Sequence, residues 1–483
     1  MDYILIDAPM TFEDRSENFG YFIPYNLYIL DYNLRYAGYK GRLLIDDNEV
    51  NDFFSDKNKQ VPSLIGISST TYSRFNAIKI IKKAKVCFPN SKVITGGVHF
   101  GNCPEDAIKQ IPEIDIVVRG EGDEVIIDLM KNALGEIPLD KINGITYRDK
   151  EGCIVSLGNR LIVESIGDVS FMDQNFQKEY FETNWLHKRM KIPALNVLTG
   201  RGCPHKCIFC SVAGIKNRKY SVKSVVDFIE KIVNKFGIKG IRFEDDSLTM
   251  DSSYIVNICD EIRKRNLNII WYCQSRANID LQILRDMYEG GCRFISVGLE
   301  SASPKIQKIL GKNISNEHVL QFAQRCSEVG INCYVYTIAS LPEETPDDLQ
   351  MTIDFAQSLR KKYGTGVGRM MVATIYPGTK LENIAIEKGI LQSNFSWNKS
   401  YYNKINTEYD QVPYIPIYIE HITPEIYKKA SKAMRVNYAL SLSVIDLMKV
   451  SYEQLFIKKD ISLKKKLHIG FTIIAKKMKN LII

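Results

Sequence analysis

The stretch Thr199-Gly-Arg-Gly-Cys-Pro-His-Lys-Cys-Ile-Phe-Cys-Ser211 places three cysteines on one glycine-entered loop, with the spacing C-x3-C-x2-C. It follows an apolar segment, Leu195-Asn-Val-Leu198, that is typical of a buried strand. Thiolates are soft ligands that suit zinc and iron–sulfur clusters. Either a structural zinc site or an ordinary four-iron cluster takes four protein ligands, and no fourth cysteine or histidine has suitable spacing, although His205 lies inside the loop. Three ligands predict a metal centre with one open position.

The segment before this loop begins a series of strand-like segments separated by helical ones. The further strand-like segments are 240–243, 269–272, 294–297, 333–336 and 370–373. Successive βα units of this kind favour a barrel or partial barrel over an open sheet. We therefore predict an α/β protein with a partial (β/α)6 barrel over residues 192–389.

The N-terminal part of the chain also alternates strand and helix. Its expected strands are 3–7, 41–45, 64–67, 93–95 and 114–118. Short apolar strands between helices predict a doubly wound parallel sheet over residues 1–140. Residues 141–191 change to short β-like runs and unpatterned aromatic and polar residues, which we interpret as a linker. Residues 390–483 lack the βα pattern and are predicted to be a mainly helical segment with a basic tail.

Composition narrows the class of protein. The chain has 483 residues, 45% of them hydrophobic and 25% charged, which excludes a disordered or collagenous chain. No apolar run approaches the roughly 20 residues of a membrane span, and the start shows no secretory signal. Eleven cysteines in such a chain should be reduced. These features predict a cytoplasmic protein.

The cysteine loop, with the aromatic Phe209 before its third cysteine, resembles the signature of the radical S-adenosylmethionine (SAM) enzymes. The resemblance implies that Cys203, Cys207 and Cys210 hold a [4Fe–4S] cluster whose open iron binds SAM. An electron from the cluster then splits SAM and releases a 5′-deoxyadenosyl radical. A zinc loop or a chance grouping of cysteines is the alternative.

Several strand ends are similar to segments that hold SAM in this family. The implied SAM-binding residues are Phe209, Glu244, Asp245, Asp246, Arg276, Glu300 and Ser301. Carboxylates at the carboxyl end of a barrel strand are well placed to accept hydrogen bonds from an ammonium group. The acids after 240–243 are otherwise solvated groups before a helix cap, and Arg276 is otherwise a surface or ion-paired side chain.

Residues 1 to about 140 resemble the cobalamin-binding domain of one branch of this family. The implied cofactor-binding residues are Ser68, Ser69, Thr70, Thr71, Gly96, Gly97, His99, Glu121 and Gly122. Ligands of open α/β sheets lie beyond the carboxyl ends of the strands, and paired glycines allow close approach of a bulky ring. The D-x-H-x-x-G motif of some cobalamin proteins is absent, so the domain either binds cobalamin without a histidine ligand or no longer binds it. His99 is a contact to the cofactor tail or a neutral loop residue.

The resemblance implies cobalamin-dependent methylation of an unactivated carbon in a small-molecule or lipid substrate, with flavodoxin or ferredoxin as the electron donor. Oxidative cyclisation, rearrangement or carbon–carbon coupling, with or without cobalamin, is the alternative outcome. Residues 458–483 contain eight lysines and one aspartate, which accounts for +7 of the net charge of +8. This tail predicts either a peripheral membrane contact or a helix packed on the barrel. Nucleic-acid binding is not expected, because basic and aromatic residues do not interleave there.

Overall fold

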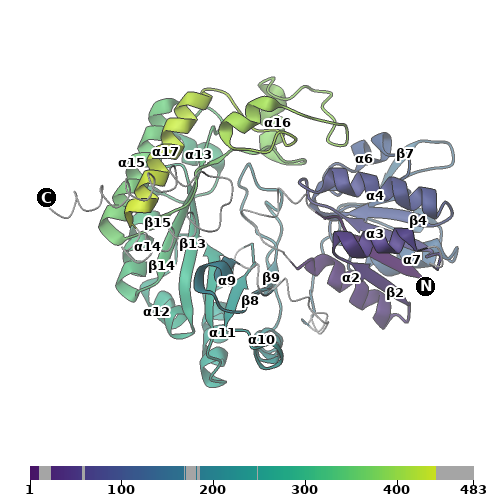
Figure 1. Cartoon of the computed structure of the whole chain (residues 1–483), viewed down its shortest axis with the longest axis horizontal. Coiled ribbons are helices and arrows are strands. Elements are labelled where there is room, and N and C mark those ends of the chain that lie inside the picture. The colour runs from purple at the N-terminus through teal and green to yellow at the C-terminus, as the bar shows by residue number, and fades with distance from the viewer. Residues whose placement is uncertain are drawn as a thin grey trace, which may run out of the picture.

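The computed structural model describes residues 1–9, 23–56, 60–167, 169, 181, 185–246 and 248–441. Two lobes lie side by side, one built from the N-terminal part of the chain and one from the middle part (Figure 1). The segment that carries helix α16 (Lys380–Glu387) lies along one edge of the molecule, above the gap between the two lobes in this view.

The N-terminal lobe is a seven-stranded sheet in the order β2-β1-β3-β4-β5-β6-β7. Its first five strands run parallel: β1 Tyr3–Asp7, β2 Gly41–Leu44, β3 Leu64–Ser68, β4 Lys92–Gly96 and β5 Ile116–Val118. Two buried clusters of apolar side chains cover its two faces. One cluster includes α3 Asp47–Ser55, α4 Arg74–Cys87 and α6 Pro104–Gln110, and the other includes α2 Tyr25–Tyr36 and α7 Val125–Ala133. Helices on both faces confirm the predicted doubly wound sheet.

This sheet extends beyond the predicted boundary at residue 140. Strands β6 (Ile145–Arg148) and β7 (Ile154–Leu157) add to it as an antiparallel hairpin beside β5. The sheet is therefore mixed, and the segment interpreted as a linker begins inside it. Burial falls from the first half of β6, where Ile145 and Thr146 are buried, to β7, which has no buried residue and forms the edge of the sheet.

The second lobe contains a parallel sheet in the order β15-β14-β13-β12-β11-β8, with β16 also paired to β14. Its strands are β8 Ala194–Val197, β11 Gly240–Phe243, β12 Ile270–Ser275, β13 Cys292–Glu300, β14 Asn332–Ala339, β15 Gly366–Val367 and β16 Met371–Val372. No pairing between β8 and β15 closes the sheet within the described part of the chain. The predicted partial barrel is confirmed.

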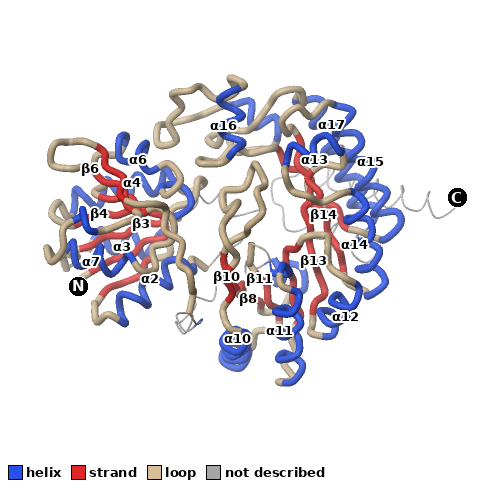
Figure 2. Tube along the Cα trace, turned by 180° about the vertical axis from the view of Figure 1, so that it is seen from behind, coloured by secondary structure: helices blue, strands red, loops and turns tan. Residues whose placement is uncertain are grey.

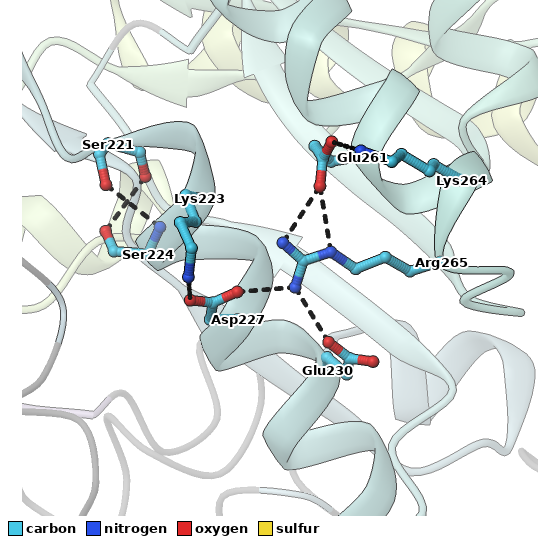
Figure 3. A network of polar contacts seen from close by, with 8 residues as sticks. All are labelled: Ser221, Lys223, Ser224, Asp227, Glu230, Glu261, Lys264 and Arg265. Carbon is cyan, nitrogen blue, oxygen red and sulfur yellow. Dashed lines mark hydrogen bonds and ion pairs between the residues drawn. The ribbon is translucent and has the colours of Figure 1, made fainter.

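Helices cover the outside of this barrel. They are α10 Val222–Phe236, α11 Ser252–Lys264, α12 Leu281–Glu289, α13 Pro304–Leu310, α14 Asn316–Val329 and α15 Pro346–Tyr363. Local signals set their ends: Ser221 caps α10 by accepting from the Ser224 N–H, and Gly237 ends it in the left-handed conformation. Figure 3 shows how Arg265, just after α11, reaches Asp227 and Glu230 on α10 at 2.7 and 2.9 Å.

Helix α16 lies at the end of the predicted barrel range. In the described part of the segment after residue 389, the helices are the 3-10 helix Lys404–Tyr409 and α17 (Pro424–Ser441). Helix α17 packs against α15 on the outer side of the barrel (Figure 2). The basic tail, residues 458–483, lies outside the described residues, so its predicted roles stay predictions. Among the described residues, no helix combines the length and apolar character needed to cross a membrane.

Candidate functional site at the junction of the two lobes

The cysteine loop lies between two short antiparallel strands, β9 (Gly200–Arg201) and β10 (Arg218–Lys219). Gly202 begins the loop at φ +88°, and a Cβ there would lie 2.4 Å from the Lys216 carbonyl oxygen. Its N–H donates to Asp246 Oδ2 at 3.0 Å, and its carbonyl accepts from Asn217 at 2.7 Å. The loop is thus closed at its base and fixed to the end of β11.

The three thiols of the loop are half-buried. Burial raises the pKa of Cys210 to about 11. Burial also raises the pKa of Cys207, while the charges of Lys312 and Arg276 oppose that shift. Within the described part of the chain, no three or more His, Cys, Asp or Glu side chains lie close enough together to hold one metal ion. Three soft thiol donors on one loop, with Lys312 and Arg276 acting on Cys207, fit an iron–sulfur cluster, because the cations compensate the negative charge of a thiolate.

Lys312 is a residue that sequence reasoning missed. Its Nζ lies 2.6 Å from both Glu300 Oε1 and the Gly298 carbonyl oxygen. Glu300 adopts a left-handed conformation at φ 59°, where the register between β13 and β14 shifts. A Cβ on Gly298 would lie 1.9 Å from Glu300 Oε1, so the glycine makes room for the folded-back carboxylate. Lys312 follows α13 and has no motif of its own that could have revealed it.

The three acids after β11 take different roles. Asp245 is buried and accepts from the Thr199 hydroxyl at 2.7 Å and from Lys219 at 3.2 Å, so it holds neighbouring strands together. Glu244 and Asp246 line the cleft described below. Burial raises the pKa of Glu244 to about 7, although Arg242 lies 2.6 Å away and opposes the shift.

Three other predicted SAM-binding residues have protein partners. Ser301 is fully buried and its hydroxyl lies 3.2 Å from that of Thr352. Arg276 donates to the Lys312 carbonyl oxygen. Phe209 packs on a buried apolar cluster beneath the loop. The backbone around these residues is therefore well supported, and of the three Arg276 is the one whose charge bears on the cysteines.

A cavity of about 230 Å³ lies at the carboxyl ends of the N-terminal strands, between α2 and α7. The residues predicted from the sequence that line it are Ser68, Gly96, Gly97, Glu121 and Gly122. The buried Thr95 hydroxyl also lines it and has no hydrogen-bond partner. A largely apolar cavity of this size, with paired glycines and one unsatisfied hydroxyl, suits one part of a large cofactor that presents apolar surface and a few polar groups.

The other predicted hydroxyl and histidine residues lie outside this cavity. Ser69 and Thr70 bond within their own turn to Ser73. The Thr71 hydroxyl lies 3.3 Å from Nδ1 of His99, which is fully buried. Burial lowers the pKa of His99 to about 3, so its imidazole is neutral. His99 lies in the short helix α5 (Gly97–Phe100), and both roles considered for it stay predictions.

A cleft of about 250 Å³ lies between the lobes. It is lined by the loop after β5, by the 160–162 segment, by the base of the cysteine loop and by the acids after β11. It shares five lining residues with the cavity, namely Gly97, Gly120, Glu121, Leu198 and Arg201. The cavity of the N-terminal lobe therefore adjoins the mouth of the barrel.

Comparison with known proteins matches the two lobes to two families. Residues 197–356 match the model of the radical SAM superfamily, and residues 19–129 match the model of the B12 binding domain. The chain therefore contains a radical SAM domain preceded by a B12-binding domain.

Individual relatives agree with this assignment. An uncharacterized methyltransferase of Pyrococcus horikoshii is 29% identical over 83% of this chain and 84% of its own length. An anaerobic magnesium-protoporphyrin IX monomethyl ester cyclase of Rubrivivax gelatinosus is 26% identical over 67% of this chain and 60% of its own length. The solved radical SAM methyltransferase TsrM of Kitasatospora setae, with cobalamin and a [4Fe–4S] cluster bound, shares the fold with a TM-score of 0.71, 15% identity, and coverage of 99% of this chain and 100% of that one.

Proposed function

We propose that this chain is a cobalamin-dependent radical SAM methyltransferase that methylates an unactivated carbon of a small molecule. The observation that carries the proposal is that the cavity of the B12-binding domain and the cleft at the mouth of the barrel share five lining residues. A methyl donor in one and a radical initiator in the other would then face the same substrate position. Holding reactants together in one water-poor cleft is what radical methylation requires.

Each cofactor has a set of residues that suits it. Cys203, Cys207 and Cys210 would hold the cluster, and Glu244 with Asp246 would accept hydrogen bonds from the ammonium group of SAM. The cavity lined by the 96–97 glycines would take cobalamin. When bound, the cluster supplies the electron that cleaves SAM, and cobalamin supplies the methyl group.

The protein's own contribution is positioning. Lys312 and Arg276 place positive charge beside Cys207. The pair of Lys312 with Glu300 fixes the bulge at the end of β13, at the carboxyl end where barrel enzymes act. The short bond from Tyr25 to the Asn196 carbonyl oxygen joins α2 to β8 and so fixes the cavity wall against the barrel.

The test is anaerobic reconstitution with iron and sulfide, followed by incubation with SAM, a reductant and hydroxocobalamin. We expect both 5′-deoxyadenosine and S-adenosylhomocysteine to form. Absence of both products would contradict the enzymatic proposal. Failure of the protein to retain cobalamin, with 5′-deoxyadenosine still formed, would contradict only the cobalamin part.

A second candidate is a radical outcome other than methylation. It is supported by the similarity to a relative that is named as a cyclase. SAM carrying a deuterated methyl group separates the two, because only methylation moves the label into a product. A product that lacks the label but forms with 5′-deoxyadenosine would favour the cyclase-like outcome.

Further features stay predictions from the sequence. They are the cytoplasmic location, flavodoxin or ferredoxin as the electron donor, a lipid as the substrate, and a peripheral membrane contact through residues 458–483. Sedimentation of the full chain with anionic and neutral vesicles tests the last of these, since a basic tail should bind only the anionic ones.

A further inference from the structure

The base of the cysteine loop carries one arginine on each strand, and both arginines reach the N-terminal lobe. Arg218 on β10 makes two bonds to the Glu121 carboxylate, at 2.6 and 2.8 Å. Arg201 on β9 lies 2.8 Å from Asp123 and 3.9 Å from Glu121. Glu121 and Asp123 belong to the loop after β5, about 80 residues or more away in the sequence.

These four side chains are largely desolvated. The side chain of Arg218 is 4% exposed, and those of Glu121, Asp123 and Arg201 are 20%, 16% and 15% exposed. Ion pairs at such sites are screened little by salt and hold their geometry firmly. Figure 3 offers the contrast: Arg265 joins α10 to α11 on the outside of the barrel, where Asp227 and Glu230 are more than 40% exposed.

The segment after β7 is also bonded to Glu121 and Arg218, through the backbone of Val163. Glu121 Oε2 accepts from the Val163 N–H at 2.7 Å, and Arg218 donates to the Val163 carbonyl oxygen. The backbone after β7 is therefore hydrogen-bonded to a residue of each lobe. Burial works against ionisation of Glu121, yet the bonds from Arg218 and Val163 outweigh it and keep the pKa of this carboxyl below its ordinary value.

The position of the group gives it a role beyond stability. Glu121, Asp123 and Arg201 all line the cavity of the B12-binding domain. Arg201 ends β9 and Arg218 begins β10, the two strands that flank the cysteine loop. A ligand in the cavity that fixes the loop after β5 would therefore also fix the base of the cysteine loop, through the ion pairs with Arg201 and Arg218. The converse holds as well, because thermodynamic coupling is reciprocal.

We propose that Glu121, Asp123, Arg201 and Arg218 form a latch that couples occupancy of the cobalamin cavity to SAM binding at the cluster loop. The inference rests on the two cofactor sites proposed above. The first ligand to bind orders the shared loops, so the second ligand binds with less loss of conformational freedom. The four residues act as positioning residues, and none of them needs to touch a reacting atom.

The experiment measures SAM affinity by anaerobic equilibrium dialysis of the cluster-reconstituted protein, with and without hydroxocobalamin. We expect cobalamin to tighten SAM binding by about fivefold or more in the wild type, and SAM to tighten cobalamin binding by the same factor. The double variant Glu121→Gln with Arg218→Gln removes both charges of one pair, so neither is left buried alone. It should bring the coupling factor to about one.

Two further variants keep the test decisive. Asp123→Asn leaves the Glu121–Arg218 pair intact and should reduce the coupling factor without abolishing it. This variant provides the test if the double variant folds poorly. Arg265→Gln removes an arginine with three carboxylate partners outside the lobe junction and should leave the coupling at its wild-type value. Wild-type protein that binds both cofactors without mutual effect would overturn the latch, as would full coupling in the double variant. Wild-type protein that binds neither would instead overturn the proposed function.

Discussion

Gly97 offers the sharpest test of the cobalamin cavity. It lies at φ +82°, and a Cβ there would be 2.7 Å from the Ser69 carbonyl oxygen, closer than the 3.0 Å below which real Cβ atoms are essentially never found. That carbonyl also accepts the His99 N–H at 3.3 Å, so it cannot turn aside without losing a bond. In Gly97→Ala the backbone at this position should therefore move, and Gly97 lines both the cavity and the cleft.

Two costs are expected in Gly97→Ala. The left-handed conformation costs an alanine about 1–2 kcal/mol, and loss of the bond to His99 adds about 1 kcal/mol. Gly135 is the matched control, because it lies at φ +81° in the same lobe and a Cβ there meets nothing within 4 Å. Gly135→Ala should carry the first cost alone.

The assay combines urea unfolding of the apo protein with titration of hydroxocobalamin. Both variants should lose stability, but only Gly97→Ala should weaken cobalamin binding, by about tenfold or more, which corresponds to about 1.4 kcal/mol. Equal cobalamin affinity in Gly97→Ala and Gly135→Ala would refute the assignment of the cavity to this cofactor.

Three further predictions concern single side chains. Cys207→Ala should abolish the iron–sulfur absorption of the reconstituted protein, whereas Cys153→Ala, at an exposed cysteine, should retain it; intact absorption in the first would refute the ligand assignment. Burial raises the pKa of Glu344 to about 8, so between about pH 4.3 and pH 8 the folded protein holds one more proton than the unfolded chain and stability falls as pH rises. Glu344→Gln should flatten the urea midpoint across that range, and an unchanged slope would contradict this. Arg218→Gln should lower the free energy of unfolding by about 3 kcal/mol at about pH 7. The stability that the Glu121–Arg218 ion pair contributes should be present above about pH 4.3 and lost as the pH falls through the depressed pKa of Glu121. A stability equal to wild type at pH 7 would argue against the ion pair.

The sequence predicted most of the fold because its main signals are local. The six apolar runs predicted as barrel strands each lie within a few residues of a strand in the structure, and the cysteine spacing needs no tertiary information. The two-residue strand β15 (Gly366–Val367) is not predicted by any such run. The sequence also does not assign the β6–β7 hairpin to the N-terminal sheet. Its strands have four residues each, and of these only Ile145 and Thr146 are buried, so they lack the continuous apolar run by which buried parallel strands are recognised.

The candidate site was harder to predict because its contacts are long-range. Glu121 was named for its place in a motif, but its partner Arg218 lies 97 residues further along the chain. Lys312 pairs with Glu300 from a loop that no pattern singles out. The hydroxyl-rich composition at 68–71 likewise does not tell which of these residues line the cavity. Of the four, only Ser68 does so, while Ser69 and Thr70 bond to Ser73 and the Thr71 hydroxyl contacts His99.

The three acids after β11 show that one further step was available from the sequence. Side chains that follow one another along an extended backbone point to opposite sides, so residues 244 and 246 should share a side that 245 does not. The structure has this arrangement, with Glu244 and Asp246 lining the cleft and Asp245 bonded to Thr199 and Lys219. The two sides also differ in how far the protein itself satisfies the carboxylates. Asp245 is already satisfied by donors from the protein, whereas burial raises the pKa of Glu244 and of Asp246, so each gains most from a cationic ligand that enters the cleft.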